Sequence, residues 1–483
     1  MEPLHELTIK KFHDGLLNKE FSAFEIAQHY FARIKEKDPE IDAYLSTAEE
    51  SALRAAEKVD IAIAKDEEVG MLAGAPLGIK DNILIKGLPA TAASKMLENY
   101  VASYDAGVIE RLKAQRAVFL GKTNLDEFAM GASTENSAFK ITKNPHDLTR
   151  VPGGTSGGSA AAVAAHLALA ALGSDTGGSI RQPASFCGIV GMSPTYGAVS
   201  RSGVIAMTSS LDQVGPMTKT VEDAAILFKA IAGKDPLDAT SSDHEFSDDL
   251  LHPQLEKIKQ LTIGLPEEYF IDGTDMAVTK EIDRVIEKLK GLGMKFKKVS
   301  LPHTKYAIAA YYIFVPAEVS SNLARFDGIR YGKSVRDGGP LKDVYLKTKG
   351  EGFGAEAKRR IILGTFVLSS GYYDAYYEKA QRVRTLVKRD FDKAFEEVDV
   401  LLTPVSPTPA FKIGEKVDDP LAMYLCDMFT LPLKLGGFPA ISIPTKSAAE
   451  LAPGELPVGF QLIGKKWREA DILGIGQYYE KIM

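Results

Sequence analysis

The chain has 483 residues, of which 45% are hydrophobic and 25% charged, and its formal net charge is −6. This composition is typical of a folded globular protein and argues against long disordered spans. The length predicts either one large α/β unit or two to three packed domains. The acidic balance argues against a broad nucleic-acid-binding face, which usually carries a basic stripe.

The cysteines and the apolar runs exclude several further classes. Cys187 and Cys426 are far apart and form no C-x-x-C pair, so neither a disulfide framework nor a cysteine-type zinc site is expected. The first residues lack the basic start and apolar core of a signal peptide. The longest apolar run, residues 160–173, is shorter than the roughly 20 residues that span a bilayer. We expect a cytoplasmic protein without membrane contact.

Helices are predicted for residues 1–65. Ser22 and Glu25 form a capping-box pattern ahead of apolar residues at helical spacing, and Pro39 is expected to end that helix. A second amphipathic stretch covers residues 47–65.

From residue 75 onward, short apolar runs alternate with helical segments, which indicates an α/β fold with crossover helices. The early strands are expected at 77–79, 83–85 and 117–120, with a helix over 106–115. A helix at 221–231 is followed by a polar, acidic loop over 235–255. Further strands are predicted at 261–265, 296–299, 398–402, 440–443 and 458–463, and further helices at 278–292, 372–395 and 469–482.

A glycine-rich segment, Pro152–Ser159, packs four glycines and three hydroxyls into eight residues just before an alanine-rich helix. Glycine allows backbone conformations with positive φ and close approach. Such a turn can therefore direct N–H groups of a helix start at a phosphate or an oxyanion. The alternative is a tight turn in which Ser159 caps the helix.

Two better-known motifs fail on context. Gly121-Lys122-Thr123 matches the end of a phosphate-binding P-loop, but Arg116 occupies the position of its first glycine. Residues 154–158 match Gly-x-Ser-x-Gly, the nucleophile elbow of α/β-hydrolases, but polar residues 144–150 stand where a strand should precede it. Nucleotide binding and the hydrolase elbow are both disfavoured.

A second small-residue cluster spans residues 173–183, where the N–H groups of residues 176–179 could converge on a developing oxyanion. A plain loop is the alternative. The eight histidines show no metal-ligand spacing, so another group would have to activate a hydroxyl. Lys80 follows an apolar strand, and burial lowers a lysine's pKa toward that of a general base. The alternative is a solvated lysine beside Asp81.

Three of these elements, in this order, resemble the signature of the amidase signature family. They are Pro-Leu-Gly-Ile-Lys80-Asp-Asn, Gly-Gly-Thr155-Ser-Gly-Gly-Ser and Asp-Thr-Gly-Gly-Ser179-Ile-Arg, extended by Phe186-Cys-Gly-Ile-Val-Gly191. The resemblance covers nearly the whole chain and implies an α/β/α sandwich, with a large mixed central sheet covered by helices on both faces. It divides the chain into an N-terminal helical region (1–70), the signature core (71–235) and a C-terminal part (236–483) that contributes the substrate pocket.

The resemblance also implies the catalytic groups. Ser179 would be the nucleophile and Lys80 the neutral base. The family places a relay serine on a cis peptide between them, and this sequence has Thr155 at that position, with Ser156 as the fallback relay. The backbone N–H groups of Thr176, Gly177 and Gly178 would form the oxyanion hole.

Within the family, the chain looks most like the A-type subunits of aspartyl/glutamyl-tRNA amidotransferases. The segments that carry this likeness are Ser321–Gly328, Glu351–Gly354, Lys358–Arg360 and Gly371–Tyr377. The likeness implies a glutamine pocket in which Arg360 (or Arg359) binds the α-carboxylate, Asp427 binds the α-amino group and Tyr311 forms a hydrogen-bonding wall. A guanidinium suits a carboxylate, and a carboxylate suits an ammonium group.

The resemblance implies a glutaminase subunit that works through a seryl-glutamyl ester and releases ammonia. A partner would use the ammonia to amidate Glu-tRNA(Gln) or Asp-tRNA(Asn). The resemblance implies B-type and C-type subunits in a heterotrimer, tRNA held mainly by the partner, and ATP and Mg²⁺ used there, with no cofactor in this chain. The alternatives are a stand-alone amidase of small or aryl amides, and a non-catalytic scaffold in which Thr155 marks a decayed site.

Overall fold

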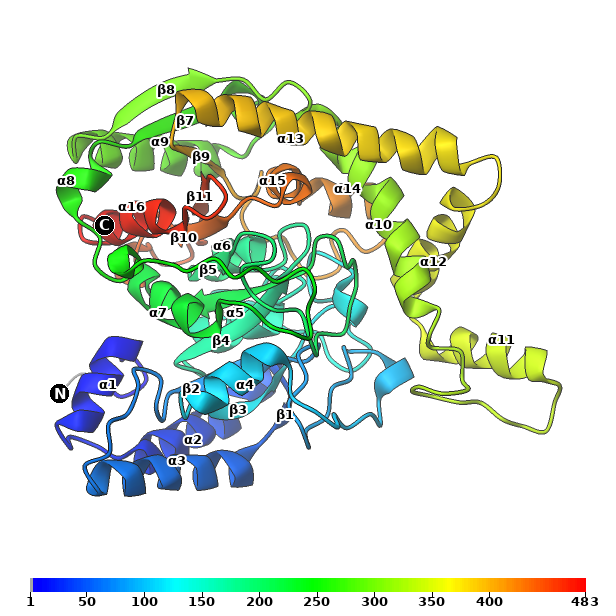
Figure 1. The fold of residues 1–483 in the computed structure, drawn as a ribbon, viewed down its shortest axis with the longest axis horizontal. Helices are drawn as coiled ribbons and strands as arrows, with labels where there is room; N and C mark the ends of the chain where they lie inside the picture. Colours follow the sequence, from blue (N-terminus) through cyan, green and yellow to red (C-terminus); the bar gives the residue numbers. More distant parts are fainter. Residues whose placement is uncertain (1–2) are drawn as a thin grey trace.

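A computed structural model describes residues 3–483, which form one eleven-stranded sheet with helices around it (Figure 1). The strand order is β1-β3-β2-β4-β6-β5-β10-β11-β9-β7-β8. β2 runs parallel to β3 and β4, β7 runs parallel to β8 and β9, and the other pairs are antiparallel. The strands are β1 (Tyr44–Thr47), β2 (Pro76–Lys80), β3 (Val118–Thr123), β4 (Ala170–Asp175), β5 (Val190–Ser193), β6 (Gln213–Thr218), β7 (Thr262–Pro266), β8 (Lys295–Val299), β9 (Val400–Pro404), β10 (Ala440–Pro444) and β11 (Gly459–Gly464).

Apolar cores lie on both faces of this sheet. Along β9, Val400 and Leu402 belong to one core and Leu401 to the other, because successive side chains of a strand point to opposite faces. The expected sandwich with a large mixed sheet is confirmed. The helices are α1 (Ile9–Leu17), α2 (Ala23–Ile41), α3 (Glu49–Ala64), α4 (Gly107–Ala114), α5 (Gly157–Ala164), α6 (Arg181–Cys187), α7 (Val221–Ile231), α8 (Leu255–Ile258), α9 (Met276–Gly291), α10 (Ala307–Leu323), α11 (Leu341–Gly352), α12 (Ala355–Val367), α13 (Lys379–Glu397), α14 (Pro420–Leu425), α15 (Leu431–Gly436) and α16 (Glu469–Glu480).

The N-terminal helices follow the sequence pattern except at one end. The capping box forms, since Ser22 Oγ accepts from the Glu25 N–H and Glu25 Oε2 accepts from the Ser22 N–H. Pro39 does not end α2, so that prediction is wrong: the helix continues to Ile41. Pro39 lies in the last turn, where proline removes a single backbone N–H bond. The Asp38 side chain stabilises the segment that follows the helix, because it accepts a hydrogen bond from the Ala43 N–H at 2.8 Å.

The predicted strand at 83–85 is also wrong. The backbone turns directly after β2, where the Ile83 N–H donates to the Lys80 carbonyl at 2.9 Å. Ile83 forms only an isolated bridge with Val204. The apolar run exists because its side chains are buried in the core, which does not require membership of the sheet.

Most other elements agree with the sequence pattern. The helices at 106–115 and 221–231 are α4 and α7, and the strands at 77–79 and 117–120 are β2 and β3. The long helix predicted over 372–395 begins instead with a π-helical turn, Tyr373–Glu378, before α13. In Figure 1, α10, α12 and α11 lie along one side of the molecule, away from α1–α3.

Candidate active site

Lys80 stands at the end of β2, and its side chain is fully buried. Its ammonium nitrogen donates to Thr155 Oγ1 at 2.7 Å, to Ser156 Oγ at 2.8 Å and to the Ser174 carbonyl at 3.2 Å. The alternative of a solvated lysine paired with Asp81 is therefore wrong, since Asp81 instead lies 3.1 Å from Lys122.

Burial also tunes Lys80. It lowers the pKa of the ammonium group to about 7, while the carboxylates of Asp126, Asp175 and Asp212 oppose that shift. At neutral pH a substantial fraction of Lys80 is therefore uncharged and able to accept a proton. Sequence patterns gave no sign of Asp126 and Asp212, because they lie far from Lys80 along the chain and outside the glycine-rich motifs.

The first glycine-rich turn holds two hydroxyls against Lys80. The Gly154–Thr155 peptide bond is cis. Gly154 is required by space: a Cβ there would lie 2.3 Å from Asp126 Oδ2 and 2.6 Å from the Ser133 nitrogen. The helix α5 starts at Gly157 after Ser156, so Ser159 does not cap it.

The two hydroxyls differ in their other contacts. Ser156 Oγ donates to the Ser174 carbonyl at 3.1 Å and accepts from the Ser174 N–H at 3.2 Å, which ties α5 to β4. Among residues 3–483, Lys80 is the only hydrogen-bond partner of Thr155 Oγ1. Thr155 therefore has hydrogen-bonding capacity left for another group, whereas Ser156 is committed to the fold.

Ser179 lies in the second small-residue turn, between β4 and α6. Its carbonyl accepts from the Ser156 N–H at 3.0 Å, so the two turns meet there. Gly178 has φ +151°, and a Cβ there would lie 2.3 Å from Thr430 Oγ1. Within the described part of the chain, the N–H groups of residues 176–178 donate to no acceptor.

A buried ion pair fixes the end of β4 just before this turn. Arg181 Nε lies 3.0 Å from Asp175 Oδ2 and its Nη2 lies 3.2 Å from Oδ1, while its Nη1 donates to Gln461 Oε1 at 2.9 Å. Burial opposes ionisation of Asp175, but the Arg181 guanidinium holds the pKa of that carboxyl below its usual value. Gln461 comes from β11, so the turn depends on a strand about 280 residues away.

Arg360, on α12, is buried, whereas Arg359 beside it is half exposed and pairs with Glu356. Arg360 Nε lies 2.8 Å from Glu356 Oε1, and its guanidinium carbon lies 5.3 Å from the centre of the Tyr312 ring and 5.7 Å from that of Tyr424. Of the two arginines, the buried one is therefore Arg360.

Asp427 and Tyr311 complete the predicted pocket set. Burial raises the pKa of Asp427 to about 8, and the positive charge of Arg360 opposes that shift. Tyr311, on α10, approaches the second turn: a Cβ on Gly177 would lie 2.9 Å from its hydroxyl oxygen. The structure thus brings Tyr311 to the turn that carries Ser179, and it buries Asp427.

Membrane spans and metal clusters are two other kinds of feature that a chain of this size can carry. Across residues 3–483, no helix has the length and apolar character to cross a membrane. Over the same range, no three His, Cys, Asp or Glu side chains are grouped so as to hold a metal ion.

The model of the family described as Amidase matches residues 25–473. The chain belongs to the amidase family. A protein of Carboxydothermus hydrogenoformans, named as the A-type subunit of glutamyl-tRNA(Gln) amidotransferase, is 56% identical over 478 residues, covering 99% of this chain and 97% of that protein. A Methylacidiphilum infernorum protein of the same name is 54% identical over 481 residues, covering 99% and 94%. The crystal structure of the corresponding glutamyl-tRNA(Gln) amidotransferase protein from Thermotoga maritima is 41% identical, with a TM-score of 0.80, covering 100% of this chain and 96% of that one.

Proposed function

We propose that this chain is the glutamine-hydrolysing subunit of a tRNA-dependent amidotransferase. The observation that carries the proposal is the buried Lys80, with a pKa of about 7, hydrogen-bonded to Thr155 in one glycine-rich turn that meets the turn of Ser179. The names of the full-length relatives support the same activity.

In the proposed reaction, Ser179 Oγ attacks the carbon of the glutamine side-chain amide. Its proton passes through the Thr155 hydroxyl to uncharged Lys80, and the N–H groups of residues 176–178 stabilise the oxyanion. Lys80 then returns a proton to the leaving nitrogen, which departs as ammonia. Water hydrolyses the seryl ester by the same route and releases glutamate.

The pocket favours an α-amino acid over a simple amide. Arg360 would bind the α-carboxylate and Asp427 the α-ammonium group, while Tyr311 lines the path to the reacting turn. In this proposal the signature core (71–235) supplies the chemistry, and the C-terminal part (236–483) supplies the pocket. An amidase of small apolar amides has no use for a buried arginine and a buried aspartate in its substrate pocket.

The acceptor chemistry is assigned to partners. We place B-type and C-type subunits beside this chain in a heterotrimer, with the tRNA, ATP and Mg²⁺ held by the partner that consumes the ammonia. The net charge of −6 is consistent with a chain that leaves the tRNA to a partner.

The test is ammonia release from glutamine by the purified full chain, alone and with the candidate partners, ATP and aminoacylated tRNA. We expect glutamine turnover that rises when the partners and charged tRNA are present. Equal turnover of glutamine and of simple aliphatic amides by the chain alone would instead support the stand-alone amidase and contradict the proposal.

A further inference from the structure

Asp212 is a buried carboxylate, outside the catalytic set above, that contacts the second turn. It stands just before β6 at the end of the segment 196–212, which we call the bracing loop. Its Oδ1 accepts from Thr176 Oγ1 at 2.6 Å, and its Oδ2 accepts from the N–H groups of Met207 and Thr208, both at 2.9 Å. Three donors on one carboxylate fix its position, because hydrogen bonds to an ionised group are short and strong.

Thr176 is the first residue of the turn whose N–H groups would bind the oxyanion. The residue before it, Asp175, is held by Arg181 on one side, and Asp212 holds Thr176 on the other. Oxyanion donors act only when they are aimed in advance at the developing charge. The hydrogen bond from Thr176 to Asp212 therefore restrains the direction of the first N–H groups in the turn.

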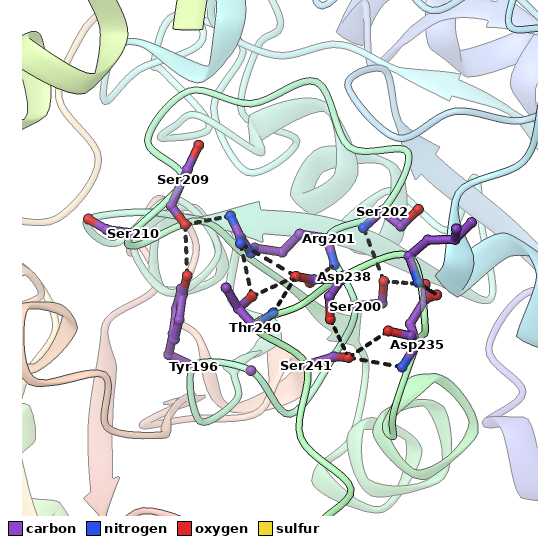
Figure 2. A network of polar contacts seen from close by, with 12 residues as sticks. Tyr196, Ser200, Arg201, Ser202, Ser209, Ser210, Asp235, Asp238, Thr240 and Ser241 are labelled. Carbon is purple, nitrogen blue, oxygen red and sulfur yellow. Dashed lines mark hydrogen bonds and ion pairs between the residues drawn. The ribbon is translucent and has the colours of Figure 1, made fainter. Parts of the chain in front are cut away.

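Polar contacts hold the bracing loop together and tie it to residues 235–241, as Figure 2 shows. Tyr196 Oη donates to the Ser209 carbonyl at 2.8 Å, and Arg201 Nη1 donates to the same oxygen. The Arg201 side chain also donates to Thr240 Oγ1 at 2.9 Å, and its backbone N–H donates to Asp238 Oδ2 at 2.8 Å. A loop held in this way can present Asp212 at a fixed place.

Two helices of the C-terminal part hold the same loop from another side. Glu318, on α10, accepts from the Ser210 N–H at 3.0 Å and from its hydroxyl at 2.5 Å. Arg384, on α13, donates to the Ser210 carbonyl at 3.2 Å. Because α10 also carries Tyr311, the loop connects the pocket helices to the oxyanion turn.

We propose that Asp212 is a positioning residue for glutamine hydrolysis, which acts through the Thr176 hydroxyl to aim the N–H groups of residues 176–178 at the oxyanion. This inference rests on the proposed function. Asp212 touches neither substrate nor the reacting atoms in this scheme, so its effect falls on the chemical step and not on glutamine binding.

The test compares Thr176→Val, which removes the hydroxyl at constant shape, with Thr176→Ser, which keeps it, in the full chain with its partners. We expect Thr176→Val to lower kcat for glutamine about 10- to 100-fold with KM within about twofold, as for the partial loss of an oxyanion donor. Thr176→Ser should stay within about threefold of wild type. Thr385→Val is the matched control, since that threonine is exposed on α13.

A second experiment uses Asp212→Asn, alone and combined with Thr176→Val. If the two groups act through one hydrogen bond, the double variant Thr176→Val/Asp212→Asn should lose no more kcat than the more damaged single variant. Full kcat in Thr176→Val, a change in KM alone, or losses that multiply in the double variant would each overturn the inference. A wild-type complex that releases no ammonia from glutamine would overturn the proposed function instead, which separates the two failures.

Discussion

The proposed catalytic residues and the proposed pocket residues are held in place by different kinds of structure. Lys80, Thr155 and Ser179 lie at a strand end and in two glycine-rich turns, and hydrogen bonds link these turns to one another. Arg360 and Asp427 come from helices and a loop of the C-terminal part, and aromatic rings and a carboxylate surround Arg360. In the proposed reaction, the chemistry depends on backbone held in one place, whereas recognition of glutamine depends on long side chains packed among aromatic rings. Variants in the first cluster should change kcat, and variants in the second should change KM.

The largest effect is expected for Ser179→Ala. Removing the nucleophile should lower glutamine hydrolysis by about 10⁴-fold or more, because the seryl ester cannot form. Ammonia release and trapping of the acyl-enzyme by mass spectrometry are the measurements. Ser51→Ala, exposed on α3, is the control, and activity retained in Ser179→Ala would refute the nucleophile.

Thr155 and Ser156 can be separated by a pair of variants. Thr155→Val should lower kcat about 10²- to 10³-fold, because it removes a proton relay of the general-base type while keeping the shape of the side chain. Thr155→Ser should remain within about threefold of wild type. Ser156→Ala, measured in the same assay, should cost less kcat than Thr155→Val but more thermal stability, since its hydroxyl is bonded to Ser174. The reverse order would make Ser156 the relay.

Arg360 and Arg359 are adjacent, and variants of the two test whether the buried one binds glutamine. Arg360→Lys should raise KM for glutamine about 10- to 100-fold with a smaller change in kcat, because a lysine loses the fork that binds a carboxylate. Arg359→Lys, one residue away and half exposed, should leave KM within about twofold. The measurement is the steady-state KM for glutamine of both variants. Equal effects on KM would show that Arg360 does not bind the α-carboxylate.

The smallest change per step is the pH dependence of the wild type, which is at most about tenfold per pH unit. With a Lys80 pKa of about 7, the uncharged base is depleted below that pH, so kcat should fall toward tenfold per pH unit between pH 6 and 5 and level off above pH 8. Asp427, with a pKa of about 8, must ionise to bind an ammonium group, so KM should fall as pH rises from 6 to 8. A kcat that is flat down to pH 5 would contradict Lys80 as the base.

The local sequence pattern was sufficient to predict those helices and strands that depend mainly on residues close by in the chain. The apolar run before Lys80 predicted β2, although it left a buried and a solvated lysine as alternatives, and the period of residues 221–231 predicted α7 to its ends. The prediction failed at residues 83–85, where burial without strand pairing gives the same apolar run. It also failed at Pro39, where the Asp38 side chain accepts a hydrogen bond from the Ala43 N–H and stabilises the end of the helix.

Long-range partners left no local signal. Asp126, Asp212 and Gln461 reach the catalytic turns from distant parts of the chain, and no spacing rule connects them to Lys80 or Ser179. The pocket residues came only from the resemblance, because nothing in the local sequence around Arg360 or Asp427 shows that the fold buries them. Of the two arginines that the sequence left open, only the structure distinguishes the buried one.

The order of the strands has a consequence for biosynthesis. β10 and β11 follow all the other strands along the chain, yet they occupy the middle of the sheet, with β10 on β5 and β11 on β9. Without β10 and β11, the sheet consists of two separate parts, of six and three strands, and their open edges are prone to mispairing in a nascent chain. Gln461 of β11 also accepts a hydrogen bond from Arg181, which holds Asp175 just before the second turn, so this support of the turn can form only after the last strand has joined the sheet.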